Sequence, residues 1–268
     1  MSISFRTPKM QMVIALLCIY ISAFFNTPSL SAIITLFSSI FSAILADVAF
    51  LRFRKKPFFF PSATIVTGLI IALLTPPTLP WYEPILASIL AIGFKNFVRI
   101  GNKHIFNPAA LGIFLTAIIF NHSVSWWAVS WQQLTLHNIF VLISFFILLS
   151  PGYVSVIRMK RWRIIVSFLI LYVLVNPFVQ SNFSIMQSFV IIPPTLFDAT
   201  TLFFALVMLP EPMTSPNNHK RQIYFGLFVT ATALVISLTT TIFPLFALIP
   251  DVYIFSLLLA NLIFFKLR

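Results

Sequence analysis

The sequence has little charge. Only 8% of its 268 residues are charged and 60% are hydrophobic, whereas a soluble domain averages about 25% charged residues. The apolar residues gather in runs that nearly fill the chain and leave no room for a water-soluble domain. The composition therefore predicts an all-α integral membrane protein, a single polytopic domain over residues 1–268, in the lipid bilayer of the cell (cytoplasmic) membrane.

Cysteine is almost absent, since Cys18 is the one thiol in the sequence. A single thiol excludes an internal disulfide, a CxxC motif and an iron–sulfur site built from this chain alone. Cys18 falls in the first apolar run, and we expect it to be a small buried hydrophobic residue.

Acidic residues are also few: 5 Asp and Glu stand against 17 Lys and Arg, a net charge of +12. The bases are spread over short loops between apolar runs, where they set membrane orientation. This distribution argues against a nucleic-acid partner. The four histidines share no metal-ligand spacing, and no nucleophile or phosphate-loop motif occurs, so the sequence predicts neither a metal site nor a catalytic residue.

About ten apolar segments can be read along the chain, each a predicted transmembrane helix. Two of them hold about 14 residues, fewer than the roughly 20 that a helix needs to cross a bilayer. The segments cover residues 11–25, 30–51, 61–75, 82–98, 107–121, 136–155, 163–180, 184–209, 222–243 and 246–265.

If these segments alternate from a cytoplasmic N-terminus, all 17 basic residues fall on one side of the membrane. This arrangement satisfies the positive-inside rule and predicts an N-in/C-in topology. Adding or removing a middle segment would place a basic cluster on the opposite side. The opposite side receives residues 122–133, whose Trp126, Trp127 and Trp131 are expected at headgroup level.

Residues 197–216, FDATTLFFALVMLPEPMTSP, form an apolar run with an acid at its head and a proline-bracketed glutamate at its tail. Residues 62–77 have a similar shape, a short apolar run between Ser62-Ala63-Thr64 and Thr75-Pro76-Pro77. Acids near lipid are costly and usually kept for function. Two short, proline-stopped segments in corresponding halves predict a binding site made from broken helices.

The polar residues near these segments allow alternatives. Asp198 and Glu211 could gate an ion or orient a polar ring, or could serve only as a helix cap or an inter-helix hydrogen bond. Asp47 is followed by a run of bases and is expected to pair with one nearby. Asn107-Pro108 predicts a helix start, and bases such as Lys103 before it form either an anion-friendly patch or simple topology anchors.

Three stretches carry a family resemblance: SATIVTGLIIALLTPPTLPW, FKNFVRIGNKHIFNPAALG and LFFALVMLPEPMTSP. They resemble the hallmark blocks of one membrane family, that of the B subunit of the sodium-translocating NADH:quinone reductase (Nqr) and the D subunit of the Rnf complex. The resemblance covers a first half, residues 61–121, and a second half, residues 195–265, with Glu211 where the family usually has aspartate. It implies a ten-helix subunit of a flavin-dependent electron-transport complex, possessing two related halves with short or broken helices.

The sequence departs from the family at one motif. Members usually carry a covalent flavin mononucleotide on the threonine of an S-G-A-T sequence in the loop after the fifth helix. Residues 122–133 contain no such motif, and Asp198-Ala199-Thr200 is similar only superficially. The chain therefore resembles a shortened member without the covalent flavin.

The resemblance implies a non-covalent FMN or riboflavin site, or a quinone site, between the two short helices. Such a subunit would pass electrons near or across the membrane, a transfer that could be coupled to ion translocation. It would need other membrane and soluble subunits, including a flavin- or iron–sulfur-containing donor. The alternative is a secondary transporter with a broken-helix substrate site. The expected cofactor-binding residues are Ser62, Thr64, Thr67, Lys103, Asn107, Asp198, Thr200, Glu211, Thr214 and Ser215.

Overall fold

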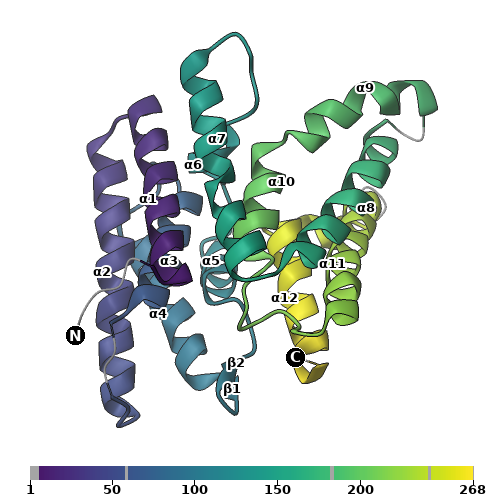
Figure 1. Cartoon of the computed structure of the whole chain (residues 1–268). Helices are drawn as coiled ribbons and strands as arrows, with labels where there is room; N and C mark the ends of the chain where they lie inside the picture. The colour runs from purple at the N-terminus through teal and green to yellow at the C-terminus, as the bar shows by residue number, and fades with distance from the viewer. Residues whose placement is uncertain (1–5, 58–59, 182–183, 241–242, 268) are drawn as a thin grey trace.

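The computed structural model of the chain describes residues 6–57, 60–181, 184–240 and 243–267. These residues form a bundle of helices with one two-stranded hairpin (Figure 1). In chain order the elements are α1 (Pro8–Asn26), α2 (Leu30–Phe53), α3 (Ser62–Leu74), α4 (Tyr82–Phe97), β1 (Arg99–Ile100), β2 (Lys103–His104), α5 (Pro108–Ile119), α6 (Trp127–Ser130), α7 (Ile139–Tyr153), η1 (Val154–Arg158), α8 (Trp162–Gln180), α9 (Ile185–Leu196), α10 (Ala199–Phe203), η2 (Phe204–Met208), α11 (His219–Thr239), η3 (Pro244–Leu248), α12 (Val252–Phe264) and η4 (Phe265–Leu267).

The lengths of the helices confirm an all-α membrane protein. Among the described residues, five helices are long and apolar enough to cross a membrane, or six if α9 and α10 count as one bent span. The helices α3 and α5 have 13 and 12 residues, about 20 Å or less, as their short apolar segments predict. The number of ten spans and the N-in/C-in orientation stay predictions.

The predicted span over residues 184–209 is not one helix. It is divided into α9 and α10, whose axes meet at 53°. Pro193 and Pro194 weaken the end of α9, and the Asp198 carboxylate caps a new helix by accepting a hydrogen bond from the Thr201 N–H at 2.7 Å. As a result α9 runs from the end of α8 across to the start of α10 (Figure 1).

The short helices α5 and α12 run in opposite directions. Before α5, the Asn107 N–H donates to Asn261 Oδ1 near the end of α12 at 2.7 Å. After α5, the Val124 N–H donates to the Pro250 carbonyl just before α12 at 3.2 Å. These two hydrogen bonds join opposite ends of α5 and α12, so the two short helices are antiparallel neighbours.

A hydrogen bond of the same kind joins two helices in each half of the chain, while the relation between the two halves stays a prediction. In the first half, Ser88 Oγ on α4 donates to the Ser39 carbonyl on α2 at 3.0 Å. In the second half, Thr230 Oγ1 on α11 donates to the Phe168 carbonyl on α8 at 3.2 Å. Each half therefore packs two of its helices through a hydroxyl-to-backbone bond, a common device where helices associate in lipid.

Two glycines allow the closest helix contacts. A Cβ on Gly112 of α5 would lie 2.3 Å from the Ala87 carbonyl oxygen of α4. A Cβ on Gly226 of α11 would lie 2.6 Å from the Ile164 carbonyl oxygen of α8. Any side chain at these positions would push the backbones apart, so both helix pairs depend on glycine.

Two local expectations need correction. Cys18 is exposed on α1, because Leu16, Ile19 and Tyr20 occupy the buried face of that helix. Asp47 does pair with a base, but the base is Lys95 on α4, at 3.6 Å, and not one of the bases that follow Asp47 in the sequence. The reason is that α2 and α4 pack against each other over much of their length.

Candidate functional site

A cavity of about 210 Å³ lies at the end of the bundle where α3 and α5 begin and η2 ends. We refer to it as the amino-end cavity. Its walls are mainly apolar, with a few polar groups. The lining residues are Lys9, Met12, Ala63, Val66, Thr67, Ile70, Lys95, His104, Asn107, Pro108, Ala109, Met159, Val207, Pro210, Glu211, Pro212 and Met213.

Glu211 is the acid of this cavity. Its Oε1 lies 3.1 Å from His104 Nε2, and its Oε2 accepts a hydrogen bond from Thr214 Oγ1 at 2.9 Å. The Ser215 hydroxyl donates to the Glu211 carbonyl at 2.7 Å. Both carboxylate oxygens are thus held by the chain, while the side chain stays 24% exposed, which leaves one edge of the carboxylate available to a ligand.

Asn107 joins three elements at the back of the cavity. Its Oδ1 accepts from the Ala110 N–H at 3.1 Å and caps α5, as the Asn-Pro pair predicts. Its Nδ2 donates to the Met208 carbonyl at 3.2 Å, at the end of the π-helical η2 where helical hydrogen bonding stops. Together with the bond from its N–H to Asn261, these contacts fix the start of α5 against η2 and α12.

Lys95 links the cavity to a buried polar cluster behind it. Its Nζ donates to Thr64 Oγ1 at 2.8 Å and lies 3.6 Å from Asp47 Oδ2. Thr64 Oγ1 donates to the same Asp47 oxygen at 2.5 Å, and the Asn96 amide donates to the other at 3.0 Å. A buried carboxylate with three partners is well compensated, so Lys95 is held in place with one side toward the cavity.

Arg161 braces the chain segment that carries Glu211. Its guanidinium donates to the Pro216 carbonyl and, at 2.6 Å, to Asn217 Oδ1. The side chain is buried, and this burial lowers the pKa of the Arg161 guanidinium from its ordinary value. In the sequence, Arg161 is only one of the basic residues that predict membrane orientation. In the structure, its hydrogen bonds hold the turn after η2 closed.

The structure brings only part of the predicted site together. Thr67, Asn107 and Glu211 line the amino-end cavity. Thr64, Thr214 and Ser215 are buried directly behind its walls and hold Lys95 and Glu211. Ser62 begins α3 and Lys103 lies on β2, and neither is among the described residues that line the cavity.

Asp198 and Thr200 lie far from Glu211, at the other end of the helix formed by α10 and η2. Together α10 and η2 form a continuous helix of ten residues, Ala199–Met208, about 15 Å long. Asp198 and Thr200 lie at its start, and Glu211 follows its end. Asp198 acts as the cap of α10, one of the alternatives left open by the sequence. The two ends of a helix cannot share one ring-sized ligand, so these residues belong to the opposite end of the bundle.

At that opposite end, the Trp-rich loop fills the interior. Trp126 is 5% exposed and donates its indole N–H to Asp251 Oδ2 at 2.6 Å. Its ring packs edge-on against Phe203, Phe204 and Tyr253. Trp126 is therefore buried inside the bundle, and the headgroup-level position of the three Trp residues stays a prediction.

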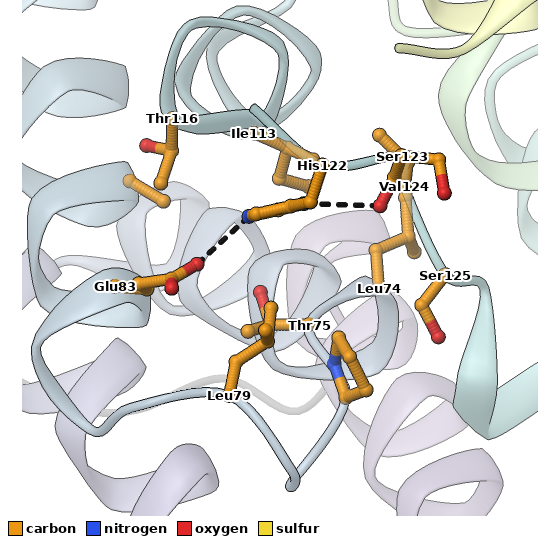
Figure 2. Close-up of a pocket in the computed structure, with 12 residues that line it drawn as sticks. Leu74, Thr75, Leu79, Glu83, Ile113, Thr116, His122, Ser123, Val124 and Ser125 are labelled. Atoms are coloured by element: carbon orange, nitrogen blue, oxygen red, sulfur yellow. Dashed lines mark hydrogen bonds and ion pairs between the residues drawn. The ribbon is translucent and has the colours of Figure 1, made fainter. Parts of the chain in front are cut away.

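A second, much smaller pocket lies where α3 and α5 end, and we refer to it as the carboxyl-end pocket (Figure 2). Figure 2 shows His122 reaching from the loop after α5 to Glu83 at the start of α4, with His122 Nε2 and Glu83 Oε2 2.8 Å apart. The pocket encloses about 10 Å³, room for about one water molecule. In the described part of the chain, no three His, Cys, Asp or Glu side chains gather as a metal site.

The site residues expected from the sequence do not include Lys95, His104 or Asn261. Lys95 and Asn261 could have been found as polar residues inside predicted apolar spans, because such residues are costly in a membrane and usually have a functional role. His104 had no comparable signal. Its position is set by the short hairpin of β1 and β2, which brings it against Glu211 from 107 positions away in the chain.

Comparison with known proteins gives one family and several relatives. The sequence model of the NQR2, RnfD, RnfE family matches residues 2–266. The D subunit of the ion-translocating oxidoreductase complex of Aliivibrio salmonicida is 29% identical over 107 residues, which cover 38% of this chain and 30% of the relative. The subunit of that name from Pseudomonas aeruginosa is 30% identical over 89 residues, 32% of this chain and 26% of the relative.

The corresponding D subunit of Psychromonas ingrahamii is 26% identical over 128 residues, or 46% of this chain and 37% of the relative. The chain thus aligns with between about a quarter and two fifths of the length of the curated relatives it matches.

Proposed function

Since this chain belongs to the NQR2, RnfD, RnfE family, we propose that it is a multi-pass subunit of an Rnf- or Nqr-like ion-translocating electron-transport complex in the cytoplasmic membrane. In this proposal the amino-end cavity holds a planar redox ring, either the head group of a quinone or the isoalloxazine of non-covalent FMN or riboflavin. The ring supplies the electron chemistry, and the chain positions it and tunes its surroundings.

The composition of the cavity wall is the observation that carries the proposal. Small-molecule sites are mostly apolar, with a few polar groups that fix orientation. Here Met12, Val66 and Ile70 supply apolar surface. Lys95 supplies a donor, and the paired His104 and Glu211 supply further polar groups, so a ring with carbonyl oxygens can be held edge-on by polar groups and face-on by apolar ones.

The volume favours a ring over a nucleotide. Pockets that enclose a drug-sized ligand have roughly 300–1,000 Å³, and the amino-end cavity has about 210 Å³. A quinone head group or the ring of a flavin suits that space, while the ribityl phosphate of FMN would have to extend outside it. Of the two, the quinone requires less room beyond the described walls.

Two helix starts favour a ligand that gains negative charge when it is reduced. Ala63, the second residue of α3, and Pro108, the first residue of α5, both line the cavity. The partial positive charge of a helix amino end favours negative charge nearby. An electron-accepting ring that becomes more negative on reduction would therefore be stabilised there.

Partners are part of this proposal. One cysteine cannot build an iron–sulfur cluster, so electrons would come from other subunits that carry flavin or iron–sulfur groups. The basic loops, predicted to be cytoplasmic, lie at the same end as the cavity, which would place a soluble donor within reach of the ring.

Direct titration of the detergent-purified chain tests the proposal. Absorbance and fluorescence before and after acid precipitation report any flavin carried by the protein, and titration with a short-chain ubiquinone, FMN or riboflavin reports affinity. We expect Val66→Trp, which fills the cavity, to weaken ring binding by at least about tenfold. Thr200→Val, at the far end of α10, is the matched control and should leave the affinity unchanged.

Equal loss of affinity in both variants, or no binding of any of the three rings, would overturn the redox-ring site. The antiparallel short helices and the break between α9 and α10 would then favour the second candidate, a secondary transporter. Solute movement by the purified chain alone in vesicles, with no bound chromophore, is the result that this alternative predicts.

A further inference from the structure

A groove on the outside of the bundle is separate from both sites described above. It lies between the first halves of α8 and α11 and encloses about 330 Å³. Val166, Ile170, Ile223 and Leu227 give it an apolar floor and walls, and Arg163 and Trp162 stand at one end. Gly226 brings the two helices together beneath it, so the groove is a built feature of the tight α8–α11 contact.

The end of the groove at Arg163 is strongly positive. The Arg163 guanidinium lies 4.5 Å from the centre of the Trp162 ring, and none of the ion pairs in the described part of the chain involves Arg163. Lys160 precedes it, and Lys220 stands in the first turn of α11. Because α8 and α11 both begin at this end, two helix amino ends add partial positive charge.

The charge and the apolar wall follow one another along α8. Arg163 is the one base of that helix, in its first turn, and the residues after it that line the groove are Val166, Ser167 and Ile170, of which only Ser167 is polar. From Arg163 to Ile170 the groove extends about 10 Å along the helix axis. A cation beside an interfacial Trp, followed by an apolar channel of that length, has the chemistry of a phospholipid headgroup region and the first part of its acyl chains.

We propose that the groove between α8 and α11 binds one anionic phospholipid, with its phosphate at Arg163 and an acyl chain along Val166, Ile170 and Leu227. A partner helix is the other possible occupant of an apolar groove. About two turns of exposed groove are a short surface for helix packing. An Arg that stacks on Trp and has no carboxylate partner among the described residues matches a phosphate better than an apolar helix.

Native mass spectrometry of the full chain in detergent tests this binding site. The protein is titrated with phosphatidylglycerol or with phosphatidylcholine of the same acyl chains. We expect one phosphatidylglycerol to be retained in preference to phosphatidylcholine. Arg163→Gln should lower its affinity at least tenfold, and Leu227→Trp, which fills the groove, should lower the affinity for both lipids.

Arg158→Gln is the matched control, because it removes one positive charge at the same end of the bundle, on an exposed side chain whose guanidinium donates to the Arg6 carbonyl. An unchanged thermal midpoint in all variants shows that they fold. Equal retention of the two lipids, or equal loss in Arg163→Gln and Arg158→Gln, would overturn the proposal. Unchanged lipid binding in Leu227→Trp with lost assembly onto partner subunits would assign the groove to a protein partner instead.

Discussion

The two ends of the short helices α3 and α5 are built from the same pair of helices and yet differ in kind. Where the helices begin, the cavity has about 210 Å³ and several polar side chains. Where they end, the pocket has about 10 Å³ and one Glu–His pair. The helices contribute to this difference, because α3 carries Ser62, Thr64 and Thr67 in its first half and is apolar from Gly68 to Leu74.

The loops contribute as well. At the carboxyl end, residues 122–133 insert Trp126 between the halves, and Trp127 donates its indole N–H to the Ala72 carbonyl of α3 at 2.9 Å. At the amino end, the hairpin contributes only the smaller His104 ring. The side chains inserted at the carboxyl end are therefore larger than the one inserted at the amino end, and the larger cavity lies at the amino end.

Trp126→Ala should produce the largest change. Removing a buried aromatic side chain costs about 3–5 kcal/mol, and here it would also open the carboxyl end toward Thr201. We expect a lower thermal midpoint and new labelling by a maleimide of Thr201→Cys in a Cys18→Ala background.

Trp126→Phe is the control for this change, since it keeps most of the ring packing and loses only the hydrogen bond to Asp251. It should cost about 1–2 kcal/mol and leave Thr201→Cys protected. Labelling that is equal in the alanine and phenylalanine variants would show that Trp126 does not close this end.

Lys95→Met should destabilise the amino end by about 3 kcal/mol, because it leaves the Asp47 carboxylate buried without its cation. The free energy of unfolding in mild detergent measures this cost. In the double variant Asp47→Asn with Lys95→Met, much of the loss should return. A double variant as unstable as the sum of the two single variants would mean that the two residues do not interact.

Asn107→Ala should cost about 2 kcal/mol. The helix cap alone accounts for about 0.5–2 kcal/mol, and the Met208 carbonyl would also lose its donor. Asn107→Asp keeps the cap acceptor and removes only that donor, so it should recover the cap's share of the stability. Ring binding should weaken in both variants, because both loosen η2 against α5. Full binding in Asn107→Asp would limit the role of Asn107 to capping.

His122→Ala should have the smallest effect, a loss of about 1 kcal/mol, since His122 is 27% exposed and its partner Glu83 can reach water through the vacated space. Ring binding at the amino-end cavity should stay unchanged. A loss of ring binding would show that the carboxyl-end pocket influences the amino-end cavity through α3 and α5. The two ends would then differ in volume but would not act independently.

Much of the fold could be predicted from the sequence. The apolar runs place most of the helices, and the short runs at residues 61–75 and 107–121 predict the short α3 and α5. The Asn107-Pro108 pair predicts a capped helix start because both residues act through neighbouring backbone. The run over residues 184–209 misled because hydropathy does not register a bend, which here depends on two prolines and the Asp198 cap.

The site could be predicted only in part. The sequence predicts one binding site made from short apolar segments. The structure brings three of the residues in or beside such segments to one cavity: Thr67, Asn107 and Glu211. Asp198 and Thr200 were grouped with Glu211 because they flank the same run. Asp198 and Thr200 lie at the start of the ten-residue helix of α10 and η2, and Glu211 lies after its end, so closeness in sequence did not become closeness in space.

The sequence by itself determined the membrane class, the positions of most helices and the residues that begin α5, because these follow from hydropathy and from local backbone hydrogen bonding. Only the tertiary structure decided that Lys95 pairs with Asp47, that His104 meets Glu211 and that Trp126 is buried. Those contacts join residues 48, 107 and 125 positions apart, and they exist because elements that are distant in the sequence pack against one another.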